Sequence, residues 1–217
     1  LCGIDPLAVA GILVTHEHSD HISGLRVFAK RYGLPVYGSE GTIRAISGSL
    51  EGVELIDIKS GAEISGMEVR PFPISHDCLQ PTGYRVHTSD GRDFCLATDL
   101  GYLSLEVKEN LLGCDLVVLE SNHDIEMLRN GPYPYHLKRR ISGRRGHLEN
   151  QDCASYLVEL AKSGATQFVL CHLSKENNIP ELALQTAYAK MSEAGIGAAE
   201  FSLQAARRSE PSPAVAL

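Results

Sequence analysis

Three imidazoles and two carboxylates fall within one short stretch near the start of the chain, His16-Glu17-His18-Ser19-Asp20-His21. The stretch directly follows the apolar run 11–14. His16 and His18 are separated by one residue and can point at the same metal ion. Asp20 and His21 lie further on and can reach a second ion. Because neutral imidazole and carboxylate are ligands that zinc, manganese and iron prefer, the spacing predicts a metal-binding loop.

Other candidate ligands stand shortly after predicted strands: His76 after 67–74, Asp99 after 94–98 and His172 after 167–170. His16 likewise follows a strand predicted over 11–15. Strand ends at one edge of a sheet converge in space, and open α/β architectures place their sites there. Each of these side chains alone would more often cap an element or fill a core. Together with the histidine-rich loop they predict a binuclear metal site, rather than a polar loop that happens to contain histidines.

Short apolar runs alternate with helical patterns along the chain, which predicts one α/β domain over 1–205 and a flexible tail over 206–217. Helices are predicted over 22–32, 39–47, 103–112, 152–162 and 180–193, with Ser39 and Asn150 as N-caps. The remaining strands are predicted over 53–58, 116–119 and 199–203, with 84–88 and 94–98 forming a hairpin. Since the chain begins with Leu1, we also expect an upstream segment to be missing.

The chain of 217 residues has no apolar run near the length of a membrane span and carries a formal net charge of −7. That charge excludes a protein that is basic throughout, as many nucleic-acid binders are. One basic cluster opposes the average, and it consists of Lys138, Arg139, Arg140, Arg144 and Arg145. This cluster can face phosphates, although a solvated basic loop would have the same composition. Six scattered cysteines without a C-x-x-C pair predict reduced thiols in a cytoplasmic protein.

The loop and the later candidate ligands resemble the metallo-β-lactamase superfamily. The loop Thr15-His16-Glu17-His18-Ser19-Asp20-His21 is similar to its T-H-x-H-x-D-H motif, and its later motifs resemble Ser75-His76, Ala97-Thr98-Asp99 and Cys171-His172-Leu173-Ser174. The resemblance implies a four-layer αββα sandwich with metals at one sheet edge and, in this chain, without the N-terminal strands. It implies that His16, His18 and His76 hold a first ion, that Asp20, His21 and His172 hold a second, and that Asp99 bridges them.

A narrower resemblance, to the YycJ/WalJ group, covers nearly the whole chain. It is carried by Glu120-Ser121-Asn122-His123-Asp124, Met127-Leu128, Gly131-Pro132-Tyr133-Pro134, Leu137-Lys138, Gly146-His147-Leu148 and His172-Leu173-Ser174-Lys175-Glu176-Asn177-Asn178. This resemblance implies a DNA exonuclease that acts from 5′ ends. The chain departs from the group at Glu149, where a serine is expected, and in lacking a glycine-rich upstream segment. Two other branches are disfavoured, because di-iron redox proteins carry Glu in place of His18 and lactamases carry Cys in place of Asp99.

A binuclear centre of this kind can hold hydroxide between its ions at neutral pH and can stabilise charge on a phosphate. Zn or Mn are the expected ions, and Fe is an alternative. Asp20 and Asp99 would take part in catalysis through the ions that they hold. His147 could protonate the leaving 3′-oxygen of a phosphodiester, and His123 is a second candidate for lining the site. For both histidines the alternative is an ordinary surface, capping or core position.

We therefore expect a metal-dependent phosphodiesterase that acts on DNA and binds the substrate backbone through the basic cluster. The alternative is a glyoxalase II-like hydrolase of thioesters or other small molecules, which would share every metal ligand but would not need that cluster. A scaffold that has lost its metals is disfavoured by the complete ligand set. The sequence leaves open the native metal, DNA against RNA, and the oligomeric state, and the 5′ polarity rests wholly on the resemblance.

Overall fold

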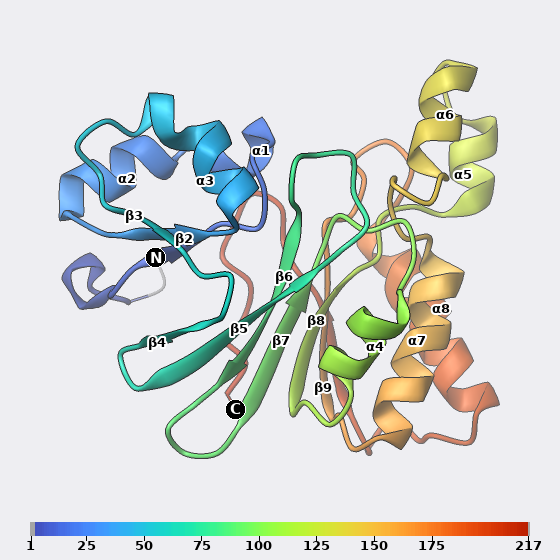
Figure 1. The fold of residues 1–217 in the computed structure, drawn as a ribbon. Coiled ribbons are helices and arrows are strands. Elements are labelled where there is room, and N and C mark those ends of the chain that lie inside the picture. The colour runs from blue at the N-terminus through green and yellow to red at the C-terminus, as the bar shows by residue number, and fades with distance from the viewer. Residues whose placement is uncertain (1–2, 217) are drawn as a thin grey trace.

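Two β-sheets form the centre of the fold in the computed structural model, which describes residues 3–216 (Figure 1). Within those residues, the smaller sheet holds three parallel strands in the order β1 (Ile12–Leu13), β2 (Val36–Gly38) and β3 (Leu55–Asp57). The larger sheet holds seven strands, in the order β10 (Ser202–Ala205), β9 (Gln167–Cys171), β8 (Leu116–Glu120), β7 (Asp93–Ala97), β6 (Thr82–His87), β5 (Met67–Pro73) and β4 (Ala62–Ile64). Neighbours from β4 to β7 run antiparallel, whereas neighbours from β7 to β10 run parallel.

The helices connect these strands, and most of them lie on the outer faces of the two sheets. They are α1 (Ser19–Ile22), α2 (Leu25–Tyr32), α3 (Glu40–Ile46), α4 (Leu105–Leu111), α5 (Ile125–Asn130), α6 (Tyr135–Ile141), α7 (Asn150–Lys162) and α8 (Pro180–Glu193), with short 3₁₀ turns at Pro6–Ala8 and Ser47–Ser49. In Figure 1, α1, α2 and α3 lie beside the smaller sheet, and α4, α7 and α8 lie beside the larger one. The pair α5 and α6 projects beyond the body of the molecule.

Clusters of buried side chains hold these elements together as layers. One cluster joins α2 and α3 to the smaller sheet and includes Leu25, Val36 and Ile46. A second cluster fills the space between the two sheets and includes Ile58 and Tyr84. A third lies between the larger sheet and the helices α4, α7 and α8. The order helix, sheet, sheet, helix confirms the predicted αββα sandwich.

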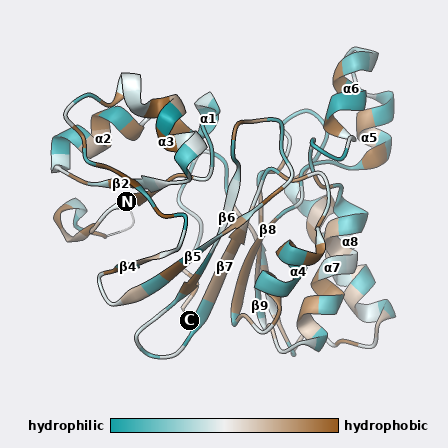
Figure 2. Ribbon diagram, in the orientation of Figure 1, coloured by the Kyte–Doolittle hydropathy of each residue, from teal (hydrophilic) through white to brown (hydrophobic). Residues whose placement is uncertain are grey.

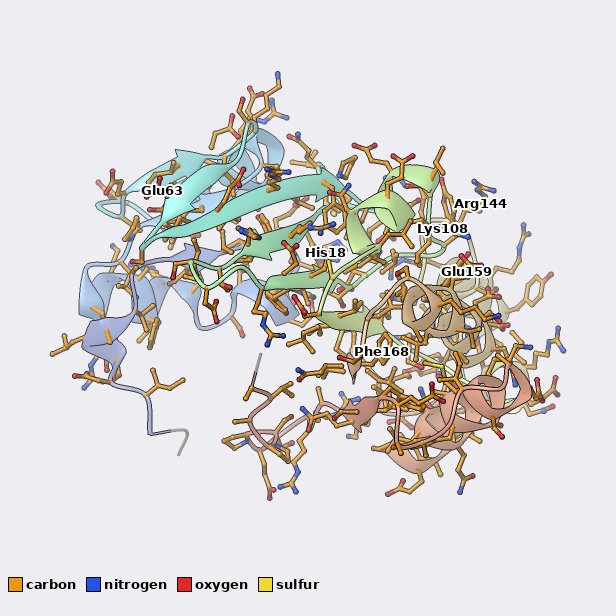
Figure 3. The ribbon with its side chains drawn as sticks, turned by 90° about the horizontal axis from the view of Figure 1, so that it is seen from below. His18, Glu63, Lys108, Arg144, Glu159 and Phe168 are labelled. Atoms are coloured by element: carbon orange, nitrogen blue, oxygen red, sulfur yellow. The ribbon has the colours of Figure 1, made fainter. Side chains whose placement is uncertain are left out.

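The larger sheet is apolar on both faces, as its place in the middle of the sandwich requires. In β7, Cys95 and Ala97 belong to the cluster under the helices, whereas Phe94 packs against the cluster between the sheets. This alternation follows from the period of a β-strand, and Figure 2 shows β7 and β8 as mostly hydrophobic. At the helical face, Lys108 of α4 and Glu159 of α7 form an ion pair of 3.0 Å (Figure 3).

Two helix starts were predicted from their caps, and one of the two is confirmed. The Ser39 hydroxyl accepts a hydrogen bond from the Thr42 N–H at 3.3 Å and caps α3. The prediction that Asn150 is the N-cap of the helix predicted over 152–162 is wrong, because the corresponding helix, α7, begins at Asn150 itself. The buried amide oxygen of Asn150 instead accepts hydrogen bonds from the Ser121 hydroxyl at 2.7 Å and from the Asn178 amide at 2.9 Å. Asn150 therefore ties the end of β8 to the loop before α8.

Most other elements lie where the sequence pattern predicts them, with some differences in length. The helix predicted over 180–193 agrees with α8 residue for residue, and the predicted hairpin corresponds to β6 and β7. The last strand, β10, begins and ends later than the predicted range 199–203. The pattern does not predict β2 and β4, because three residues are too few for a clear alternation. It also misses α5 and α6, which bury little of their surface and so show no apolar period.

The remaining predictions concern the cysteines, the tail and the membrane. Cys78, Cys95, Cys114, Cys153 and Cys171 are free thiols, and Cys2 lies outside the described residues. The described part of the predicted tail, 206–216, contains no helix or strand. Among residues 3–216 we find no helix whose length and hydropathy would carry it through a bilayer.

Candidate metal centre

His16, His18 and His76 form the first group of candidate ligands. The ring centroids lie 4.7 Å apart for His16 and His18, and 5.1 Å from each of these to His76. One ring nitrogen from each residue lies within 4.8 Å of the other two. The Nε2 atom of His16 is buried and has no hydrogen-bond partner among residues 3–216. A buried polar atom without a partner is costly, and a metal ion held by the three rings would satisfy it.

Asp20, His21 and His172 form a second group on the other side of the loop. The Asp20 Oδ2 atom lies 3.8 Å from His21 Nε2 and 3.6 Å from His172 Nε2. The side chain of Asp20 is 65% exposed, so this group is open to solvent on one side. The ligand atoms of all three residues again lie within 4.8 Å of one another. Two imidazoles and one carboxylate suit a divalent ion of the zinc or manganese kind.

Asp99 lies between the two groups. Its Oδ2 atom is 3.2 Å from His21 Nε2, and its Oδ1 atom is 3.7 Å from His76 Nε2. The carboxylate is 2% exposed. Asp99 and His172 both have positive φ angles, +60° and +54°. L-residues rarely adopt this left-handed conformation, which concentrates at functional sites where the surroundings enforce it. Here it turns both side chains back from the ends of β7 and β9 toward the cluster.

Neighbouring groups hold the imidazoles by their other nitrogens. The Thr15 hydroxyl lies 3.2 Å from His16 Nδ1 and 3.1 Å from His21 Nδ1. His76 Nδ1 lies 3.3 Å from the Gly146 carbonyl oxygen. In each case the contact at Nδ1 leaves Nε2 for the cluster. Hydrogen bonds of this kind fix the tautomer and orientation of metal-binding histidines.

Glu120 is a central residue to which the sequence analysis assigned no role. Its Oε1 atom lies 2.7 Å from His172 Nδ1 and 2.8 Å from His147 Nδ1. Its Oε2 atom accepts hydrogen bonds from the N–H groups of Leu100 at 2.9 Å and Leu148 at 3.3 Å. The side chain is fully buried. The signal in the sequence was the same as for the other site residues, since Glu120 ends the apolar strand β8.

The charges of these groups reflect burial and their partners. Burial, with nearby His21, lowers the pKa of His16 to about 3. Burial also opposes protonation of His172, but the hydrogen bond and charge of Glu120 outweigh it and raise the pKa of His172 to about 9. The same balance raises the pKa of His147. Burial would raise the pKa of Glu120, yet the hydrogen bonds from the two histidines keep it below its usual range. The centre thus holds a buried anion with two imidazoles that share it.

The two histidines proposed as catalytic lie at different depths. The His147 ring centroid is 5.1 Å from that of His76 and 5.2 Å from that of His172, so this side chain touches both groups. His147 is 18% exposed. His123 is 1% exposed, and its Nδ1 atom has no hydrogen-bond partner within the described part of the chain. Burial lowers the pKa of His123 to about 4. His123 is not in any of the ligand groups, and a role for it in catalysis stays a prediction.

The basic cluster runs from α6 to the loop before α7, where α6 is an element that the sequence pattern did not predict. Arg140 Nε lies 2.6 Å from Asp77 Oδ2, and Arg145 donates from Nε and Nη2 to the His76 carbonyl oxygen at 3.1 and 3.0 Å. Arg145 therefore contacts the backbone of the first ligand group, and Arg140 contacts the residue that follows His76. Of the other members, Lys138 donates to the Arg129 carbonyl, Arg139 lies near the Tyr135 ring and Arg144 stacks on the Tyr102 ring.

Comparisons with known proteins agree with this geometry. A family model described as the beta-lactamase superfamily domain matches residues 4–173. The exodeoxyribonuclease YycJ of Bacillus anthracis is 40% identical over 200 residues, which cover 88% of this chain and 74% of that protein. The exodeoxyribonuclease WalJ of Streptococcus pneumoniae is 37% identical over 199 residues, with the same shares covered. The chain therefore belongs to the metallo-β-lactamase superfamily, and within it to the group that contains these two relatives.

Solved structures share the fold at much lower sequence identity. YhfI from Bacillus subtilis, a metallo-β-lactamase fold protein, aligns with a TM-score of 0.70 at 15% identity, over 94% of this chain and 78% of that chain. A diphosphatase from the PhnP family aligns with a TM-score of 0.62 at 20% identity, over 91% of this chain and 68% of that chain. These likenesses concern the fold alone. Together with the family and the cluster of histidines and acids, they identify the chain as a metal-dependent hydrolase, as predicted.

Proposed function

We propose that this hydrolase is a phosphodiesterase that removes nucleotides from the 5′ ends of DNA in the cytoplasm, with two divalent ions as cofactors. The observation that carries the proposal is the position of Asp99. Its carboxylate contacts both ligand groups, since Oδ2 lies 3.2 Å from His21 Nε2, and Oδ1 lies 3.5 Å from His172 Nδ1 and 3.7 Å from His76 Nε2. A carboxylate shared in this way suits a pair of neighbouring ions. Zn or Mn fit the nitrogen and oxygen ligands, and Fe remains an alternative.

We assign the side chains to the two ions as follows. The first ion would be held by His16, His18 and His76, the second by Asp20, His21 and His172, and Asp99 would contribute to both; the ligand atoms within each of these two histidine-containing groups lie close together. When bound, such ions lower the pKa of a water molecule, polarise a phosphate oxygen and stabilise the charge that develops on phosphorus. Thr15 and Glu120 keep the histidines oriented for this task through their contacts with Nδ1 atoms.

His147 is placed to act on the leaving group. Hydrolysis forms a bond from a water oxygen to phosphorus and breaks the bond from phosphorus to the 3′-oxygen, which must gain a proton. His147 lies against both ligand groups, and its raised pKa favours the protonated form. Glu120 engages Nδ1, which leaves Nε2 for the substrate. We assign His147 the role of general acid at the 3′-oxygen.

The members of the basic cluster have two different roles, one structural and one in substrate binding. Arg140 and Arg145 are already engaged by Asp77 and by the His76 carbonyl, so they position the cluster beside the first ligand group. Lys138 and Arg139 have no acidic partner among the ion pairs of the described chain and lie on α6, away from the ligands. We propose that these two side chains contact phosphates of the DNA backbone. Such contacts are electrostatic, independent of base sequence and weakened by salt.

Support for DNA as the substrate comes from the relatives. YycJ and WalJ are both named exodeoxyribonucleases, and each aligns over 88% of this chain. The basic cluster beside the ligand groups agrees with a polyanionic substrate, in a chain whose overall net charge is −7. A thioester hydrolase would use the same ligands but has no need of this cluster. No feature of the described residues favours the thioester over the phosphodiester.

The proposal is tested by degradation of double-stranded DNA labelled at its 5′ ends, in the presence of Mn²⁺. We expect the chain to release short labelled products, and His16→Ala and Asp99→Ala to release none. A parallel measurement of bound metal separates the possible failures. A chain that binds metal but leaves DNA intact contradicts the exonuclease and makes thioesters the next substrates to test. A chain that binds no metal contradicts the assignment of the ligands.

A further inference from the structure

A cavity of about 370 Å³ opens directly beside the first ligand group. His76 is one of its lining residues, so the cavity and the candidate metal centre have this residue in common. Its size falls within the range of pockets that bind small organic molecules, about 300–1,000 Å³. Nothing in the catalytic proposal above uses this space.

Three loops that are far apart in sequence form the wall of the cavity, and hydrogen bonds join them. The Ser75 hydroxyl donates to the Arg144 carbonyl at 2.7 Å, and the Gly101 N–H donates to the Ser75 carbonyl at 3.3 Å. The loops after β5 and β7 are thereby attached to the segment before α7. Gly101 fits tightly in this joint, because a Cβ atom there would lie 2.3 Å from the Gly143 carbonyl oxygen. The cavity is therefore a built feature of the fold.

The lining combines apolar side chains with an aromatic ring and a cation. Leu79 and Pro81 supply apolar surface from the loop after β5, and Tyr102 supplies its ring from the loop after β7. The Arg144 guanidinium carbon lies 4.0 Å from the centroid of the Tyr102 ring, so one face of the ring is already covered. Arg145 also lines the cavity and is fixed by its two hydrogen bonds to His76.

We infer that this cavity binds the terminal nucleoside of the substrate, with its base against Tyr102 and Leu79. The inference rests on the proposed phosphodiesterase function. A phosphate at the ligand groups would place the 3′-oxygen of that nucleoside near His147, whose ring neighbours His76. The cavity lies beside the same histidine. Stacking on an aromatic side chain accepts every base, because each base has a π face. The cavity would thus hold a chain end without reading its sequence.

The binding of two small ligands to the metal-loaded chain of residues 1–217 tests this inference. One ligand is 2′-deoxyadenosine 3′-monophosphate, whose phosphate mimics the scissile group and whose base can enter the cavity. The other is inorganic phosphate, which can reach only the metal centre. By isothermal titration calorimetry we expect the nucleotide to bind about tenfold more tightly or better, as one stacked base provides. Tyr102→Ala should bring the ratio of the two affinities close to one, and Tyr102→Phe should preserve it.

Matched variants separate the cavity from general damage to the fold. Leu79 is 60% exposed and lines the cavity, whereas Leu105 is 73% exposed and lies on α4 outside it. We expect Leu79→Ala to weaken nucleotide binding and Leu105→Ala to leave it unchanged. Unchanged phosphate affinity in Tyr102→Ala reports an intact metal centre. Equal affinity of the original chain for both ligands overturns the inference, as does an equal effect of the two leucine variants.

The same titration distinguishes this inference from the proposed function. If the chain degrades DNA but binds both ligands equally, the exonuclease proposal is supported and the nucleoside site is contradicted. If the chain prefers the nucleotide but leaves DNA intact, the nucleoside site is supported and the exonuclease proposal is contradicted. If the chain binds neither ligand, the nucleoside site is contradicted.

Discussion

Glu120 is a single side chain on which two histidines depend. It is fully buried at the end of β8, and burial of a carboxylate is costly unless hydrogen bonds compensate for the lost water. Two imidazoles and two backbone N–H groups surround it. His172 is a candidate ligand and His147 the proposed general acid, so one anion orients both. Its loss should therefore affect metal binding before it affects the overall fold.

We predict that Glu120→Gln lowers the affinity for the metal by about 10- to 100-fold, the usual cost of losing a group that orients a metal-binding histidine. The amide has the same shape but carries no charge to hold the two imidazoles. The affinity can be measured by competition with a chelator of known strength. Glu63→Gln is the control, because Glu63 is exposed on β4 (Figure 3). Equal affinities of the two variants would argue that Glu120 has no part in the centre.

His147 allows a test that depends on the leaving group. We predict that His147→Gln lowers kcat on DNA by about 10²- to 10⁴-fold, the usual contribution of a general acid. Hydrolysis of bis(p-nitrophenyl) phosphate should decrease far less, since p-nitrophenolate leaves without a proton. Steady-state kinetics on both substrates check this, with His136→Gln, an exposed position on α6, as the control. Equal losses on the two substrates would exclude the proton-donor role.

At the scale of elements, α5 and α6 form an arm that extends beyond the sandwich (Figure 1). Arg140 of α6 pairs with Asp77 beside the candidate metal centre, and Arg145, in the loop that follows α6, bonds to the His76 carbonyl. The arm and the first ligand group should therefore move as one unit. A polyanion that contacts Lys138 and Arg139 on the arm would be held at a fixed distance from the metal centre.

We predict that the double variant Lys138→Gln, Arg139→Gln raises KM for DNA and makes it less sensitive to salt. Each lost phosphate contact should reduce the slope of log affinity against log salt concentration by about one. The kinetics of bis(p-nitrophenyl) phosphate should stay unchanged, because this small ester does not reach the arm. The double variant Lys162→Gln, Lys190→Gln, on α7 and α8, removes the same charge and serves as the control. If the double variant and the parent chain show the same slope of log affinity against log salt concentration, the arm is not part of the DNA-binding surface.

For the whole molecule, the candidate ligands come from both sheets. The loop from His16 to His21 follows β1 of the smaller sheet, whereas His76, Asp99 and His172 follow strands of the larger sheet. A metal bound here would connect the two sheets at one edge. Its free energy of binding would add to the stability of the folded state, since the unfolded chain does not hold the cluster together.

We predict that removal of the metal lowers Tm by about 10 °C. Saturation at 1,000 times Kd contributes about 4 kcal/mol, and each kcal/mol shifts Tm by about 2–4 °C for a domain of this size. Calorimetry with and without a chelator measures the shift. The His16→Ala variant should show a low Tm that does not respond to added metal. A Tm that is independent of the metal in the parent chain would show that the centre does not join the sheets.

Much of the metal centre could be predicted because its residues follow a simple rule of position. His16, His76, Asp99 and His172 each stand shortly after the end of a strand, and a parallel or mixed sheet brings such ends together. The histidine-rich loop made the rule visible. Glu120 lies at the end of β8 and follows the same rule, but it stands outside the histidine and aspartate motifs that mark the ends of the other strands. His123 also follows β8, but it lies buried and apart from the ligand groups.

The parts that could not be predicted depend on contacts between distant segments. The arm has no apolar period, because its helices bury little surface. Polar contacts position it instead, from Arg140 to Asp77 and from the following Arg145 to the His76 carbonyl. The cavity beside the metal centre exists only because the loops of Ser75, Gly101 and Arg144 meet. The prediction that Asn150 caps a helix was wrong for a similar reason, since its side-chain oxygen accepts hydrogen bonds from Ser121 and Asn178. Local sequence patterns carry no information about such partners.

The spread of the ligands along the chain has a consequence during protein synthesis. The loop that begins at His16 leaves the ribosome well before His172, which follows only after β9 has been made. The early loop can meet any divalent ion in the cell, but on its own it supplies only part of either ligand group. Selection between competing metals therefore occurs only in the nearly complete protein, because the spacing of all the ligands is fixed only then. The concentrations of free ions at that moment, and not at the start of translation, would decide which metal the enzyme receives.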